Sequence, residues 1–130
     1  MPERVLITGG AGFIGSHLAA SHLDSGDEVH LIVRPEGVLR AERIRPGAIV
    51  HALDLKNLDR VRACFDRSDP TILYHLASDT GRAPGVPDPS EWPAMTSDLD
   101  NLLVLLAAAA GSPGLRVMVR AGSIAEYGNQ

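Results

Sequence analysis

Short apolar runs and amphipathic stretches alternate along the whole chain. Runs rich in aliphatic and β-branched residues predict strands at residues 3–8, 28–34, 48–52, 71–77 and 115–121. Between them, apolar positions at helical spacing predict helices at 13–25, 58–67 and 92–110, with one helical turn at 39–44 in the connector 35–46. Strands that alternate with helices build a parallel sheet through right-handed crossovers. The pattern therefore predicts an α/β fold with a doubly wound parallel sheet that stops after its fifth strand.

Single residues mark where some of these elements begin and end. Gly26 follows the helix 13–25, and Asn57 stands where an N-cap residue would start the helix 58–67. Residues 78–91 are rich in Pro, Gly, Asp and Ser, which predicts a long loop of the kind that is usually functional in a compact domain. Along one side of the first helix we expect five residues: Phe13, Ile14, His17, Leu18 and Ser21.

A glycine-rich turn joins the first predicted strand to the first helix. Gly9, Gly12 and Gly15 are spaced three apart, directly after the apolar run 5–7. Gly9 can adopt a tight turn, Gly12 clears the backbone N–H groups for phosphate oxygens, and Gly15 lets the helix pack closely on the first strand. A strand, a glycine turn and a helix in this order predict a site for the pyrophosphate of a dinucleotide. The alternative is an ordinary strand-to-helix turn without a ligand.

Length, composition and charge narrow the classes of protein. The chain has 130 residues, enough for one domain with a core, and its 45% hydrophobic and 22% charged residues are typical of a globular protein. A net charge of −4 argues against nucleic acid as a partner, and we see no apolar run that could span a membrane. The N-terminus lacks a signal-peptide pattern and Cys64 is the single cysteine, so we expect a reducing, cytoplasmic location. Scattered histidines predict no metal site.

Residues at the ends of the other strands are candidates for holding the same ligand. Arg34 ends the second strand, where an acidic residue would favour the ribose hydroxyls of NAD, and its guanidinium favours the 2′-phosphate of NADP. The carboxylate of Asp54 could accept a hydrogen bond from the adenine amino group, with the Leu55 backbone beside the ring. Ala77 and Ser78 are small and would let the cofactor approach the backbone. The alternatives are that Arg34 is a solvated surface arginine, that Asp54 is a turn carboxylate, and that Ala77 and Ser78 serve only packing.

Together these segments resemble the extended short-chain dehydrogenase/reductase family of NAD(P)-dependent sugar-nucleotide epimerases, dehydratases and reductases. Residues 8–18 are similar to its phosphate-binding segment, which implies contacts from Phe13 and Ile14, and residues 74–78 to its fourth-strand segment, which implies that Leu76 borders the cofactor. Asp54-Leu55 resembles its adenine-binding pair. The resemblance implies a Rossmann-type NAD(P)-binding domain over residues 1–130.

The segment 123–128 resembles the serine segment of the same family. The resemblance implies that the Ser123 hydroxyl positions the reacting oxygen of the substrate, whereas the residue type alone suggests a turn. The sequence departs from the family at Asp98, where many members carry asparagine, and it contains no Tyr-x-x-x-Lys pair, since Lys56 is its one lysine. In the implied mechanism that tyrosine is the general acid/base and the lysine lowers its pKa.

We therefore interpret the 130 residues as the N-terminal part of a larger enzyme, inactive by itself, whose substrate is a nucleotide sugar. The ending Glu126-Tyr127-Gly128 and the strand 29–34 favour a dehydratase or reductase over an epimerase. One alternative is a module that binds NADP for sensing or scaffolding; another is a truncated product without function. An unpaired fifth strand predicts association or marginal stability. The resemblance also implies a homodimer, formed through the helices 58–67 and 92–110.

Overall fold

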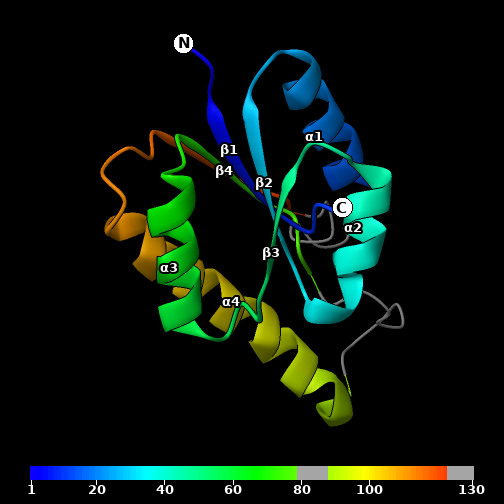
Figure 1. The fold of residues 1–130 in the computed structure, drawn as a ribbon. Coiled ribbons are helices and arrows are strands. Elements are labelled where there is room, and N and C mark those ends of the chain that lie inside the picture. The colour runs from blue at the N-terminus through cyan, green and yellow to red at the C-terminus, as the bar shows by residue number, and fades with distance from the viewer. Residues whose placement is uncertain (79–87, 123–130) are drawn as a thin grey trace, which may run out of the picture.

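The strands and helices alternate as the sequence predicts. The computed structural model describes residues 1–78 and 88–122 (Figure 1). Within these residues the five strands form one parallel sheet in the order β3-β2-β1-β4-β5. The elements are β1 (Arg4–Thr8), α1 (Phe13–Asp24), β2 (Glu28–Val33), the 3-10 turn η1 (Pro35–Gly37), α2 (Val38–Ile44), β3 (Ile49–Ala52), α3 (Leu58–Ser68), β4 (Ile72–His75), the 3-10 turn η2 (Pro89–Glu91), α4 (Trp92–Ala110) and β5 (Val117–Arg120).

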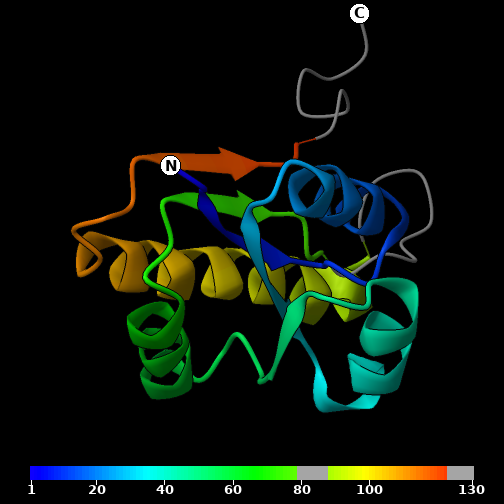
Figure 2. The same cartoon turned by 45° about the horizontal axis from the view of Figure 1, so that its top comes forward.

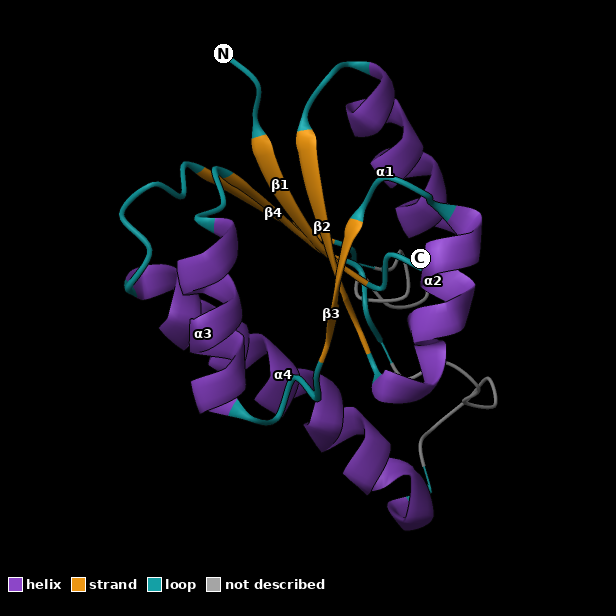
Figure 3. Cartoon of the chain, in the orientation of Figure 1, coloured by secondary structure: helices purple, strands orange, loops and turns teal. Residues whose placement is uncertain are grey.

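Helices cover both faces of this sheet. α1 and α2 pack on one face and α3 and α4 on the other (Figures 2 and 3). Alternate residues of each strand point to opposite faces, so Leu6 and Leu73 enter the core under α3 and α4, while Val5 and Ile7 enter the core under α1. Strand order reverses between β1 and β4, because β2 and β3 lie to one side of β1 and β4 and β5 to the other. In such sheets, ligands bind at the carboxyl ends of the strands at this reversal.

Of the five residues expected along one side of α1, Leu18 alone is partly buried against the core. Phe13 and Ile14 are 81% and 66% exposed, and His17 and Ser21 are exposed as well. Three small residues are buried instead: Gly15, Ser16 and Ala19. Small side chains let the helix lie close to the sheet, and the spacing of large apolar residues cannot reveal such a contact. The connector after β2 is also more regular than predicted, because η1 leads directly into the seven-residue helix α2.

Other local signals are confirmed. The side chain of Asn57 accepts a hydrogen bond from the backbone N–H of Arg60 at 3.1 Å and so caps α3. Gly26, with φ +83°, follows the end of α1. α4 covers the whole of the predicted helix 92–110. Within the described residues no helix is long and apolar enough to cross a membrane.

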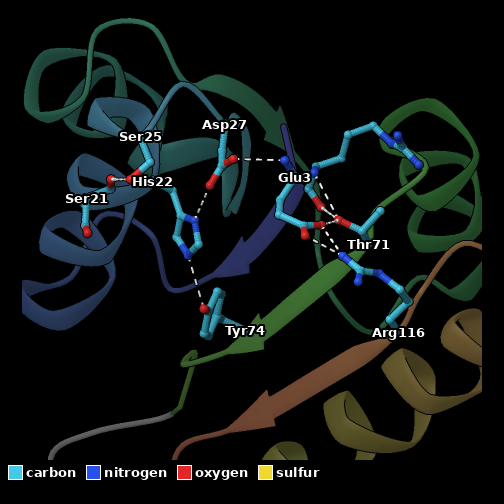
Figure 4. A network of polar contacts seen from close by, with 9 residues as sticks. Glu3, Ser21, His22, Ser25, Asp27, Thr71, Tyr74 and Arg116 are labelled. Atoms are coloured by element: carbon cyan, nitrogen blue, oxygen red, sulfur yellow. Dashed lines mark hydrogen bonds and ion pairs between the residues drawn. The ribbon is translucent and has the colours of Figure 1, made fainter. Parts of the chain in front are cut away.

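A polar network ties together the amino ends of the strands, opposite to the edge where ligands would bind (Figure 4). His22 Nδ1 lies 2.7 Å from Asp27 Oδ2, and His22 Nε2 lies 3.1 Å from the Tyr74 hydroxyl. Asp27 also accepts from the backbone N–H of Glu3, whose carboxylate binds Thr71 and Arg116. The hydrogen bond from Arg116 lowers the pKa of Glu3, and that from His22 lowers the pKa of Asp27. Because these residues lie on or beside four strands, the network fixes how the strands are staggered.

Candidate functional site

The site begins where β1 and β4 end side by side. The backbone N–H groups of Leu76 and Ala77 both donate to Thr8 Oγ1 at 3.1 Å. The same oxygen lies 2.7 Å from Nδ1 of His75, so its hydroxyl hydrogen points to that nitrogen. Burial lowers the pKa of His75 and so favours its neutral form. Thr8 therefore holds the end of β4 against the start of the glycine turn.

Two of the three spaced glycines of this turn, Gly9 and Gly15, have no room for side chains. Gly9 has φ +72°, and a Cβ there would lie 2.8 Å from the backbone nitrogen of Ala77. A Cβ on Gly15 would lie 2.3 Å from the Gly9 carbonyl oxygen. Gly12 is less crowded, since its Cβ would lie 3.2 Å from that oxygen. Gly15 thus packs on the turn that follows β1, whereas the sequence predicted that it packs on the strand itself.

The turn leads directly into the N-terminus of α1. Gly12 is the N-cap residue, no side chain caps the helix, and its first turn contains no acidic residue. The N–H groups of Phe13 and Ile14 belong to the first turn, where helical N–H groups have no partner within the helix. Together with the positive end of the helix dipole they favour an anion such as a phosphate.

A groove of about 620 Å³ opens beside this turn, and we call it the strand-end groove. It collects residues that follow four strands, together with one face of α4. Eight of the predicted cofactor residues line it: Gly9, Gly12, Arg34, Asp54, Leu55, Leu76, Ala77 and Ser78. Phe13, Ile14 and Gly15 are not among its lining residues and lie at the start of α1. The predicted catalytic residue Ser123 lies outside the described residues.

Several lining residues were not predicted from the sequence. Ser97 and Asn101 enter the groove from α4, and Glu36 and Lys56 from the segments after β2 and β3. The signal for the first two is their spacing of four, which places both on one face of a helix that is otherwise mostly apolar.

Charges of both signs line the end of the groove near β2 and β3. Arg34 Nε lies 3.9 Å from Glu36 Oε1, and both side chains are largely exposed. Asp54 Oδ1 accepts a hydrogen bond from the backbone N–H of Lys56 at 2.9 Å. This bond makes Asp54 a turn residue, and a carboxylate has a second oxygen with which to bind a ligand.

Asp98 of α4 lies beyond the carboxyl end of β4, beside Ser78. It accepts a hydrogen bond from the Ser78 hydroxyl at 3.0 Å. Within residues 1–78 and 88–122, no cluster of three or more His, Cys, Asp or Glu side chains could hold a metal ion. This part of the chain therefore offers a ligand hydrogen-bond donors, a helix N-terminus and bare backbone, rather than metal ligands. Glycines without room for a Cβ fit the close approach of a pyrophosphate.

Comparisons with known proteins agree with this geometry. The model of the NAD dependent epimerase/dehydratase family matches residues 5–130. UDP-glucose 4-epimerase from Streptomyces lividans is 28% identical over 129 residues, which are 98% of this chain and 38% of that protein. The structure of UDP-glucose-4-epimerase from Stenotrophomonas maltophila, with bound NAD and formylated UDP-arabinopyranose, is 25% identical with a TM-score of 0.79 and covers 98% of this chain and 39% of that one.

A second solved structure shows the same fold. A putative epimerase from Burkholderia cenocepacia has a TM-score of 0.83 at 24% identity, over 99% of this chain and 40% of that one. The chain thus spans about two fifths of the length of the relatives that it matches. The five-stranded parallel sheet is a Rossmann-type fold, as predicted. With a family match over residues 5–130, the chain belongs to the NAD dependent epimerase/dehydratase family.

Proposed function

We propose that residues 1–130 form the dinucleotide-binding part of an NAD(P)-dependent enzyme that acts on a nucleotide sugar. The observation that carries this proposal is the turn at Gly9 and Gly15, which has no room for a Cβ and opens onto the strand-end groove. The bound NAD of the Stenotrophomonas maltophila structure and its UDP-sugar ligand support the two halves of the proposal.

Each part of the groove has a role in this proposal. The glycine turn and the N-terminus of α1 hold the pyrophosphate, with backbone N–H groups from Phe13 and Ile14. Asp54 accepts from the adenine amino group, and the Leu55 backbone lies beside the ring. Leu76, Ala77 and Ser78 border the cofactor at the end of β4. When bound, the dinucleotide supplies a hydride acceptor or donor.

The proton chemistry needs groups beyond this site. Ser123 is proposed to hydrogen-bond the reacting oxygen of the substrate. A proton-transfer residue must stand close to that oxygen, and the 130 residues contain no Tyr-x-x-x-Lys pair to provide it. We therefore propose that this chain alone binds the cofactor and has little activity. The sequence pattern favours reduction or dehydration of the nucleotide sugar by the parent enzyme. Epimerisation, which the names of the relatives give, is the alternative reaction.

We also propose that the cofactor is NADP rather than NAD. Arg34 lines the groove at the end of β2, and its guanidinium can bind a 2′-phosphate with two hydrogen bonds. Glu36 lines the same groove and lies against Arg34, so its carboxylate opposes this preference. Arg34 follows β2 directly, and we expect its attraction for the 2′-phosphate to exceed the repulsion from Glu36.

A second candidate function is a cofactor-binding module without chemistry. Complete absence of a Tyr-x-x-x-Lys pair from the native gene product would favour it over the enzyme. Under both functions we propose a cytoplasmic location, in keeping with the buried thiol of Cys64, and no nucleic-acid partner.

We propose a second copy of the chain as partner through α4, where Leu99, Leu103 and Leu106 are exposed.

The experiment is a calorimetric titration of the 130-residue chain with NADPH and with NADH. Tighter binding of NADPH would support both the glycine turn and the role of Arg34. Tighter binding of NADH would keep the site and overturn the NADP preference. Binding of neither would overturn the proposed function of this chain. A Gly9→Ala variant, in which the turn is blocked, is the control for specific binding.

A further inference from the structure

We propose that Asn101 recognises the adenine base of the bound dinucleotide by a pair of hydrogen bonds from its side-chain amide. The inference rests on the proposed function, because it assumes that a dinucleotide occupies the strand-end groove. It adds a specificity-determining residue on α4, a helix that the sequence analysis gave no part in holding the cofactor.

The first observation is an unsatisfied polar atom. Among the described residues, Asn101 Oδ1 is the one buried side-chain nitrogen or oxygen without a hydrogen-bond partner. Folded proteins rarely leave a buried polar atom unpaired, because it loses its bonds to water and gains none in return. Such an atom calls for an explanation, and a role in binding is one.

The second observation is where this atom lies. Asn101 lines the strand-end groove together with Asp54 and Leu55, the residues proposed to contact adenine. Ser97 lines it one helical turn earlier, so a polar face of α4 borders the groove. Leu105 and Ala108 of α4 are apolar and pack into the core. A leucine at position 101 would remove the unpaired atom, so an asparagine there is not explained by the fold.

The chemistry of the amide matches one edge of adenine. An asparagine amide carries an acceptor beside a donor, and adenine presents its exocyclic amino donor beside a ring-nitrogen acceptor. Because Oδ1 is shielded from solvent here, the amide must turn about its terminal torsion to reach a ligand, and that torsion has a broad energy profile. On the edge that carries N7, hypoxanthine has a carbonyl oxygen in place of the amino group and presents two acceptors, so the amide can make only one of the two hydrogen bonds whichever way it is turned.

The test pairs a change in the protein with a change in the base. The wild-type chain and Asn101→Leu are titrated by calorimetry with NADP, with NAD and with nicotinamide hypoxanthine dinucleotide. Thr96→Leu, at an exposed position of α4 outside the groove, is the control. We expect Asn101→Leu to weaken binding of NAD and to reduce the preference for adenine over hypoxanthine by about tenfold, as the loss of a two-bond contact to a base would. Thr96→Leu should keep both affinities.

Three other results would overturn the proposal. If Asn101→Leu weakened both dinucleotides equally, or neither, the amide would not read the base. If the wild-type chain bound no dinucleotide, the proposed function would fail first, and the inference with it. Thermal unfolding without ligand gives a second readout: Asn101→Leu and Asn101→Ala should melt no earlier than the wild type if the amide serves binding. A clear fall in both melting temperatures would assign Asn101 to the fold and overturn the proposal.

Discussion

Thr8 Oγ1 lies 2.7 Å from Nδ1 of the buried His75, and this contact joins the two strands between which the strand order reverses. The same hydroxyl oxygen accepts from the N–H groups of Leu76 and Ala77. One side chain of β1 thus satisfies three groups at the end of β4. Since Gly9 follows Thr8 and touches the Ala77 backbone, the position of the glycine turn depends on this contact.

Replacing Thr8 with valine should destabilise the chain. Valine has a similar shape, but it removes the acceptor of the Ala77 N–H and the partner of the His75 ring nitrogen, while the Leu76 N–H keeps its bond to the Thr8 carbonyl oxygen. We expect a loss of about 2–4 kcal/mol in the free energy of unfolding, measured by urea denaturation. Thr8→Ser retains the hydroxyl and should lose about 1 kcal/mol, for one methyl group. Equal losses in the two variants would show that the hydroxyl is not what holds β4.

Gly9→Ala should abolish tight dinucleotide binding. The alanine would need a positive φ and would place its Cβ 2.8 Å from the Ala77 nitrogen, so the turn must move. Gly26→Ala is a matched control, because Gly26 also has a positive φ but a Cβ there meets nothing within 4 Å. We expect both variants to lose about 1 kcal/mol of stability from backbone strain, Gly9→Ala to lose more because of its clash with the Ala77 backbone, and Gly9→Ala alone to lose at least tenfold in affinity for NADPH by calorimetry. An unchanged affinity in Gly9→Ala would show that the turn does not hold the ligand.

Much of the fold follows from the sequence because each strand is a continuous apolar run that ends at turn-forming residues. The glycine turn and the strand ends could be placed for the same reason, and eight residues of the groove lining came with them. The packed side of α1 could not, since Gly15, Ser16 and Ala19 are too small to give a hydrophobic signal. Asn101 was missed because a polar residue on a helix is usually solvated, and the burial of its Oδ1 depends on the tertiary packing of α4.

Cofactor preference should respond in opposite directions to two substitutions at the end of β2. Removing the guanidinium in Arg34→Ala should weaken NADPH binding about tenfold and leave NADH binding nearly unchanged, because only NADPH has the 2′-phosphate. Glu36→Gln removes a nearby negative charge and should strengthen NADPH binding. Arg43→Ala, an exposed arginine of α2 outside the groove, is the control. The same loss for both cofactors in Arg34→Ala would exclude contact with the 2′-phosphate.

Stability should fall as the pH drops below about 6.5. Burial lowers the pKa of His51 and of His75 below the ordinary value, so the folded chain resists protonation that the unfolded chain accepts. The stabilisation is fully present above the ordinary histidine pKa and is lost as the pH falls below it. His51 also lies against His30, with ring nitrogens 2.8 Å apart, and near Arg67, so a proton there meets positive charge.

Urea denaturation at pH 7.5 and pH 5.5 checks this expectation. His51→Gln retains a polar side chain but cannot titrate, so its stability should fall less between the two values than that of the wild type. A wild-type stability that rose on acidification would contradict the lowered pKa values. The carboxylates of Glu3 and Asp27, whose pKa values are also lowered, lose their contribution at lower pH and do not interfere.

The exposed leucines of α4 should govern association of the chain. Leu99, Leu103 and Leu106 are spaced by four and three, so they form one apolar stripe, and Leu103 is 54% exposed at its centre. A charge within that stripe would be buried without a partner in a dimer, and Leu103→Glu should therefore shift the chain to a monomer in analytical ultracentrifugation. Leu39→Glu is the matched control, since Leu39 is more exposed but lies alone on α2. If both variants sediment as the wild type does, α4 is not the interface. If both dissociate, added charge alone is enough to separate the copies, and the result does not assign the interface to α4.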